Sequence, residues 1–125
     1  MNGEHRLFAL RGATSVTTNT EPAILDATEL LVRELIERNA LEIDLIVSCI
    51  FTVTGDLDAA FPAVAARRLG LDRVPLLCAR EIDVPGALQS VIRVLIHYYA
   101  PPDHIARHVY LGEARSLRAD LDAAQ

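Results

Sequence analysis

No lysine occurs among the 125 residues of the chain, and all 12 of its basic side chains are arginines. This absence excludes a lysine Schiff base, a lysine anchor for pyridoxal phosphate and the lysine of a Walker loop. Arginine is always charged and presents a planar fork of donors that suits a carboxylate. A GC-rich genome alone would also produce a lysine-free composition.

Cysteine is scarce, with only Cys49 and Cys78 present. Two cysteines form no disulfide framework and no zinc ligand set, which fits a reducing cytoplasm. The four histidines have no metal-ligand spacing, and the GxSxG, GxGxxG and GxxxxGK[ST] patterns are absent. Cys49 lies within the apolar stretch LIVSCIFTV, so we expect it in the core.

A membrane span needs about 18 consecutive apolar residues, and Arg93 and His97 interrupt the best candidate. The N-terminal residues MNGEHRLFAL also lack the pattern of a signal peptide, so we expect a cytoplasmic protein without a membrane partner. A net charge of −5 argues against nucleic acid as a partner. Apolar residues make up 51% of the chain, and we expect the surplus to be buried between subunits of an oligomer.

Hydrophobic periodicity and turn signals predict one α/β domain over residues 1–125, with a mixed sheet and two main helices. A helix is expected after Thr20, a plausible N-cap, with Pro22 in its first turn and Asn39 near its end. A shorter helix is expected between Pro62 and Gly70. Strands are expected at residues 6–12, 45–53, 74–79, 90–99 and 107–114, and residues 122–125 are expected to form a flexible tail.

One of the predicted strands contains a guanidinium in an otherwise apolar run, SVIRVLIHYY, at Arg93. Taking a cation out of water costs several kcal/mol unless partners compensate. Alternation places Arg93, Leu95 and His97 on one face of the strand. If this strand pairs with the last one, Arg93 and Tyr110 could lie side by side. A purely structural explanation of Arg93 would be a position on an edge strand or an internal salt bridge.

Six short motifs follow one another along the chain: RGAT at 11–14, FPAxAxR at 61–67, VPLLCAREI at 74–82, IRV at 92–94, RHVYL at 107–111 and LRADL at 117–121. In this order and spacing they resemble the monofunctional trimeric bacterial chorismate mutases, over about residues 7–121. The resemblance implies a homotrimer with a pseudo-barrel of packed sheets and active sites in clefts between subunits. It also implies the [3,3] Claisen rearrangement of chorismate to prephenate, in phenylalanine and tyrosine biosynthesis, without cofactor or metal.

The resemblance also implies roles for individual residues. Arg93 would reach the ether oxygen of chorismate, and Arg11 and Tyr110 would hold the side-chain carboxylate. Glu81 and Cys78 would meet the ring hydroxyl side, although Cys78 could equally be a small apolar filler. The other expected substrate-binding positions are Phe61, Ala63 and Leu117 as apolar walls, Arg67 and Arg118 at the mouth, and Leu76 and Leu77.

Two positions depart from some members of the family. Val64 stands in place of a lysine and Leu77 in place of a threonine. Neither position carries the central charge, so the departures concern the rim of the pocket and substrate affinity more than the chemistry.

This chemistry agrees with the residue types that the chain contains. A unimolecular rearrangement needs no base or nucleophile, only a held conformer and stabilised charge. Negative charge grows on the ether oxygen and positive charge on the ring, which suits a cation such as Arg93 and a carboxylate such as Glu81. Two alternatives stay open: a trimeric enamine/imine deaminase of similar architecture, and a non-catalytic trimer that binds an aromatic-pathway metabolite.

Overall fold

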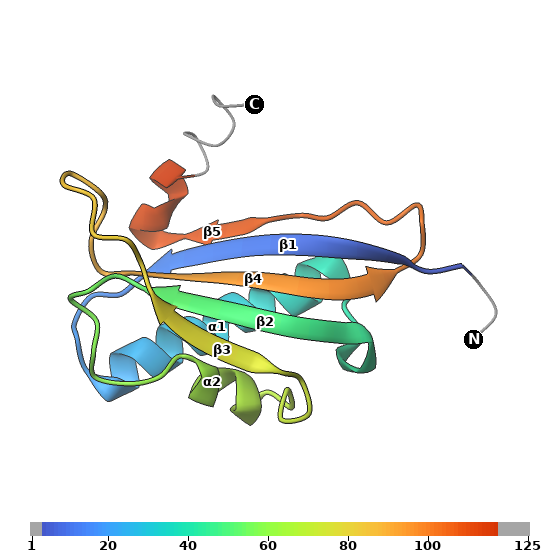
Figure 1. Cartoon of the computed structure of the whole chain (residues 1–125), viewed down its shortest axis with the longest axis horizontal. Coiled ribbons are helices and arrows are strands. Elements are labelled where there is room, and N and C mark those ends of the chain that lie inside the picture. Colours follow the sequence, from blue (N-terminus) through green and yellow to red (C-terminus); the bar gives the residue numbers. More distant parts are fainter. Residues whose placement is uncertain (1–3, 118–125) are drawn as a thin grey trace.

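The computed structural model describes residues 4–117, which form an α/β fold around one five-stranded sheet in the order β3-β2-β4-β1-β5 (Figure 1). The strands are β1 (Arg6–Ser15), β2 (Ile46–Val53), β3 (Leu76–Arg80), β4 (Val91–Ala100) and β5 (Val109–Leu111). The helices are α1 (Glu21–Asn39) and α2 (Ala63–Arg68), and 3-10 turns occupy Ile43–Leu45 and Gly112–Ala114. The predicted class, an α/β fold with two main helices, is confirmed.

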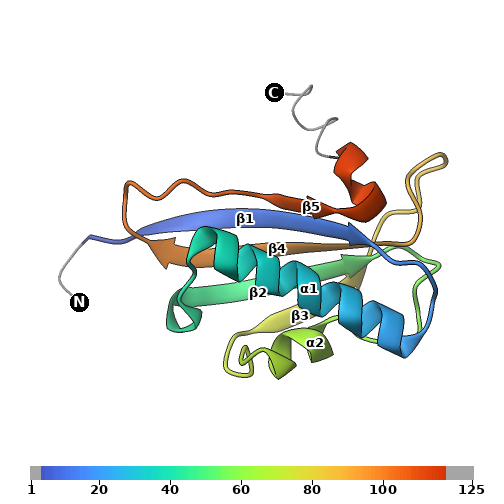
Figure 2. The ribbon, with the colours of Figure 1, turned by 180° about the vertical axis from the view of Figure 1, so that it is seen from behind.

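The sheet is mixed, as predicted. β4 lies at its centre and pairs antiparallel with β1 and β2, whereas β2 pairs parallel with β3 and β1 pairs parallel with β5. Both helices lie on the same face of the sheet, with α1 crossing it diagonally (Figure 2). Neither helix covers the opposite face, which we call the open face; the segment 112–117 packs against one end of it through Ala114. The side chains of the open face are therefore left uncovered by either helix.

The long helix begins and ends where the sequence predicts. The Thr20 hydroxyl accepts from the Ala23 N–H and Pro22 occupies the first turn, while Ala40 adopts the left-handed conformation after the last residue. On the sheet side, Leu35 lies so close to β1 that a Cβ added at Gly12 would stand 2.7 Å from its Cδ1. Gly12 thus lets α1 settle directly on β1.

The predicted alternation in β4 is also confirmed. Ile92, Val94 and Ile96 are buried under α1, whereas Arg93 is only half-buried on the open face. Cys49 lies in the same core as predicted, 1% exposed, and burial raises the pKa of its thiol to about 12. Its thiol is therefore a structural group and not a nucleophile.

Two strand predictions need correction. β1 continues past Gly12 to Ser15, because it remains paired with β4 over its whole length. The last strand spans only Val109–Leu111 and pairs with β1, not with β4. β4 already has a neighbour on each side, and the returning chain joins the free edge of β1 instead. Gly112, at φ 59°, then turns the chain out of the ladder.

The turn that links β2 to the loop before α2 is fastened to the start of β4 by Asp56. Its carboxylate accepts from the Ser90 hydroxyl at 2.6 Å, from the Thr54 hydroxyl at 2.6 Å and from the Ser90 N–H at 3.2 Å. These hydrogen bonds, first that of the Ser90 side chain and then that of Thr54, lower the pKa of Asp56 from its ordinary 3.8.

Asp56→Asn is expected to lower the free energy of unfolding by about 1 kcal/mol at pH 7, a small value because the carboxylate is exposed. A depressed folded-state pKa gives stability that is present above the unfolded-state pKa and is lost as the pH falls through the folded one. The difference between variant and wild type should therefore shrink below about pH 4, the unfolded-state pKa of aspartate. Urea unfolding between pH 7 and pH 3 measures it, with the exposed Asp26→Asn in α1 as the control. A difference that does not change with pH would contradict the explanation.

Candidate active site

A row of side chains crosses four strands on the open face. Arg93 of β4 pairs with Thr52 of β2 on one side and with Ala13 of β1 on the other. Ala13 in turn pairs with Tyr110 of β5. Arg93 and Tyr110 therefore share a face, as predicted, but they are not neighbours, since β1 lies between their strands. The methyl group of Ala13 is small enough to leave space between them.

That space is a cavity of about 260 Å³. Ala13 lines it together with four polar side chains, those of Arg11, Thr52, Arg93 and Tyr110. Among the described residues that line it, two are arginines and none is acidic, although the whole chain carries a net charge of −5. A cavity with two fixed cations and a phenol attracts a small anion.

The only carboxylate that the described structure pairs with Arg93 is that of Glu81. Glu81 follows β3 directly, and its N–H donates to the Val53 carbonyl at 2.8 Å, which continues the β2–β3 ladder by one residue. Its Oε2 lies 3.6 Å from Arg93 Nε, which is an ion pair but too long for a hydrogen bond. The two charged groups therefore lie close together, but no hydrogen bond forms between these two atoms.

The guanidinium of Arg93 is partly buried and incompletely satisfied. Its side chain is 42% exposed, yet its Nε is buried and has no hydrogen-bond partner in the described structure. A buried donor without a partner costs about 1–3 kcal/mol, and such atoms are rare. An acceptor oxygen on a bound ligand would satisfy it.

Thr52 is a member of the site that the sequence analysis did not identify. Its hydroxyl donates a hydrogen bond to Glu81 Oε2, the same oxygen that faces Arg93. Alternation along residues 45–53 could have placed Thr52 opposite the buried Phe51. Its contact with Glu81, however, depends on the parallel pairing of β2 with β3, which no local pattern reveals.

Thr52→Val keeps the shape of the side chain and removes the hydroxyl that holds Glu81. We expect kcat/KM to fall about 5-fold, which corresponds to about 1 kcal/mol, the contribution of one hydrogen bond. Thr28→Val is the matched control, because the Thr28 hydroxyl is also buried but donates only to Ile24 within α1. Steady-state kinetics on both variants decide the matter, and an unchanged kcat/KM for Thr52→Val would remove Thr52 from the site.

Two of the other candidate residues, Phe61 and Cys78, lie in a second place. Phe61, 71% exposed, and the half-buried Cys78 line another cavity of about 570 Å³ between α2 and the edge strand β3. Val64, one of the two positions that depart from some family members, lines it as well. Within one subunit, therefore, the candidate residues do not meet in a single cavity.

Five further predicted positions lie around these two places. Leu117 and Tyr110 both pack against the small buried cluster that contains Ala13. Leu77 is exposed on the open face, while Leu76 is half-buried against the core. Ala63 is buried in the core and Arg67 is exposed on α2. Their contacts with substrate stay predictions, and Arg118 and the tail at 122–125 lie outside the described residues.

Residues 4–117 contain no group of three or more histidine, cysteine, aspartate or glutamate side chains arranged to hold a metal ion. Within the same range, neither helix is long and apolar enough to cross a membrane.

Comparison with known proteins decides the family. The family model for chorismate mutase type I matches residues 7–121. The chain belongs to this family. It is 50% identical to chorismate mutase AroH of Thermus thermophilus over 93% of this chain and 97% of the relative. It is 43% identical to chorismate mutase AroH of Bacillus subtilis over 90% of each.

A solved structure agrees with the chorismate mutase family. The chorismate mutase from Clostridium thermocellum superposes with a TM-score of 0.82 at 49% identity, covering 87% of this chain and 98% of that one. The resemblance carried by the six motifs is thereby confirmed over the range in which it was predicted. None of these relatives is described as a deaminase.

Proposed function

We propose that the chain converts chorismate to prephenate by the [3,3] rearrangement, in a cleft built around Arg93 and Glu81. Membership of the chorismate mutase family carries the activity. The observation that supports the assignment of residues is that Arg93 lines a cationic cavity and has a buried Nε without a hydrogen-bond partner in the described structure. The roles of Arg93 and Glu81 follow from where charge develops during this reaction.

As the C–O bond of the enolpyruvyl ether breaks, negative charge develops on the ether oxygen and positive charge on the ring. Arg93 Nε donates to that oxygen and strengthens this hydrogen bond as the charge grows, because the donor is already in place and needs no reorganisation. Glu81 carries the opposite charge, and its Oε2 lies 3.6 Å from the same nitrogen of Arg93. It faces the ring, where Thr52 holds its Oε2 in position.

Substrate binding requires a partner for the side-chain carboxylate of chorismate. Arg11 and Tyr110 flank Arg93 in the cavity and hold the side-chain carboxylate, which leaves Arg93 free for the ether oxygen. Fixing the folded conformer in which the two reacting carbons approach each other supplies part of the rate enhancement.

We further propose that three copies assemble into a ring and complete the site between neighbours. The cavity of about 260 Å³ is smaller than ordinary ligand pockets of about 300–1,000 Å³, so one subunit alone does not enclose a substrate. Large apolar side chains are also uncovered on the open face, among them Leu7, Leu77 and Tyr99. The Phe61 and Cys78 surface is separate from the Arg93 surface. Two different surfaces that meet between copies form a head-to-tail interface, which generates a ring when the rotation between copies closes.

In this arrangement Phe61 and Cys78 of one subunit face the Arg93 cleft of the next. The whole chain, residues 1–125, acts as one domain in the cytoplasm, without a cofactor, in the synthesis of phenylalanine and tyrosine. Light scattering on the purified protein should give three times the chain mass of 13.7 kDa. A monomeric mass at the concentration used for the activity assay would rule out a shared site.

The activity itself is tested by following chorismate disappearance spectrophotometrically and identifying the product. Prephenate as the product, formed without added metal or cofactor, is the expected result. Tight binding of chorismate without turnover would instead indicate a metabolite-binding trimer, and hydrolysis of an imine substrate would indicate a deaminase.

A further inference from the structure

Tyr110 sits on the least secured strand of the sheet. β5 has three residues and pairs with β1 only at Gly12, Ala13 and Thr14. The chain reaches it through residues 101–108, which form no helix or strand and run along the outer side of β1 (Figure 1). A short edge strand with few ladder bonds opens easily unless other contacts hold it. The contacts that hold β5 therefore bear on where Tyr110 stands.

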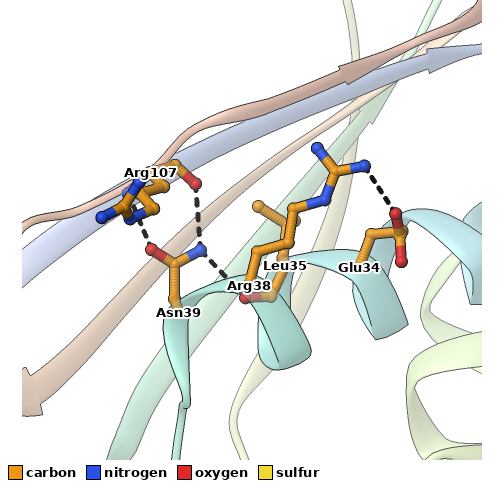
Figure 3. A network of polar contacts seen from close by, with 5 residues as sticks. All are labelled: Glu34, Leu35, Arg38, Asn39 and Arg107. Atoms are coloured by element: carbon orange, nitrogen blue, oxygen red, sulfur yellow. Dashed lines mark hydrogen bonds and ion pairs between the residues drawn. The ribbon is translucent and has the colours of Figure 1, made fainter.

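The strongest of these contacts comes from the last residue of α1. The Asn39 side chain is buried and points at the backbone of Arg107, three residues before Tyr110 (Figure 3). Its Nδ2 donates to the Arg107 carbonyl at 2.9 Å, and its Oδ1 accepts from the Arg107 N–H at 2.7 Å. The amide thus pairs with both backbone groups of one residue, as a neighbouring strand would.

A second contact follows at the next residue. The N–H of Arg11, in β1, donates to Nδ1 of His108 at 3.0 Å. This hydrogen bond joins β1 to the residue that immediately precedes β5. Asn39 also donates to the Leu35 carbonyl at 2.9 Å, so its amide is anchored in the last turn of α1. The helix that packs on β1 is therefore coupled directly to the chain entering β5.

We propose that Asn39 is a positioning residue for the reaction: its amide sets where β5 joins β1 and thereby holds Tyr110 in the row with Arg93. This inference rests on the proposed role of Tyr110 in holding the substrate carboxylate. Removing the amide leaves the N–H and the carbonyl of Arg107 without these partners, and the incoming chain can then shift along β1. A displacement of about 1 Å at a binding group can cost as much as 100-fold in rate.

The test is a double-mutant cycle on chorismate kinetics with Asn39→Ala, Tyr110→Ala and the combined variant. Each single change is expected to raise KM about 10-fold, and the combined variant should exceed Tyr110→Ala by no more than about 2-fold, since residues that act through one group are not additive. A combined increase near the product of the two single ones, about 100-fold, would overturn the inference, because the two residues would then act independently.

The single variants separate this inference from the function it rests on. If Tyr110→Ala raises KM and Asn39→Ala does not, the role of Asn39 is wrong and that of Tyr110 stands. If Tyr110→Ala leaves KM unchanged, the role of Tyr110 is wrong and the inference about Asn39 falls with it.

Two further variants separate positioning from a general loss of stability. Asn39→Asp keeps an acceptor for the Arg107 N–H and loses the donor to its carbonyl, so KM should lie between wild type and Asn39→Ala. Thr28→Val removes another buried polar contact of α1, far from Arg107 along the helix, and should leave KM unchanged. Amide hydrogen exchange should be faster at β5 in Asn39→Ala, with β2 unaffected. An equal rise of KM in Thr28→Val, or unaltered exchange at β5, would contradict the proposal.

Discussion

Arg93→Ala is expected to lower kcat at least about 100-fold, since one preorganised donor to a developing oxyanion contributes about 10²–10³ in rate. The protein should remain folded, because the residue lies on the open face and its side chain is 42% exposed. A millionfold acceleration needs about 8 kcal/mol, of which this donor supplies about 3–4 kcal/mol. Selection of the reactive conformer must then provide a comparable share. Single-turnover kinetics measure the effect, with circular dichroism as the check on folding.

Two replacements at the same position separate charge from shape. Lysine supplies a point charge without the planar fork, so Arg93→Lys should recover part of the lost activity. A neutral isostere of the guanidinium, citrulline, should recover little. If citrulline restored the turnover of the wild type, stabilisation of charge would be the wrong explanation for Arg93.

Glu81→Gln is expected to lower kcat by about 30-fold or more, as the ring loses the carboxylate that faces its developing positive charge. Glutamine keeps the size of the side chain and an oxygen that can still accept from Thr52, so the effect reports on charge. The control is Glu34→Gln, which removes a carboxylate from an exposed ion pair with Arg38 on α1 and should leave kcat unchanged.

The result that would count against this role of Glu81 is a normal kcat with a raised KM. Glu81 would then serve only to hold Arg93, at 3.6 Å, in its resting position. Measuring kcat and KM separately for Glu81→Gln distinguishes the two roles.

The local part of the structure could be predicted from the sequence. Alternation along residues 90–99 placed Arg93 opposite Ile92 and Val94 correctly, because the period of a strand is a property of the strand alone. The start of α1 followed from Thr20 and Pro22, because capping depends on neighbouring residues. Three residues of the cationic cavity, Arg11, Arg93 and Tyr110, lie in the short motifs RGAT, IRV and RHVYL.

The long-range part could not be predicted. β5 pairs with β1 and not with β4, because β4 already has two neighbours. This depends on the order of all the strands in the sheet, which local sequence patterns do not give. Thr52 became a site residue through a hydrogen bond to Glu81, 29 positions away. Asn39 looked like an ordinary helix end, yet its amide binds Arg107, 68 positions further along the chain. Each of these contacts depends on which strands are neighbours, and residue spacing does not record that.

The close approach of α1 to β1 has a consequence for engineering this enzyme. At Arg11, Gly12 and Ala13 one strand presents alternate residues to the helix and to the cavity, and Leu35 fills the place where Gly12 would carry a side chain. A bulkier side chain at position 35 would therefore press on the backbone beside Arg11. Libraries meant to retune the catalyst can start inside the hydrophobic core, and thermostabilising redesign of the helix should be screened for turnover from its first round.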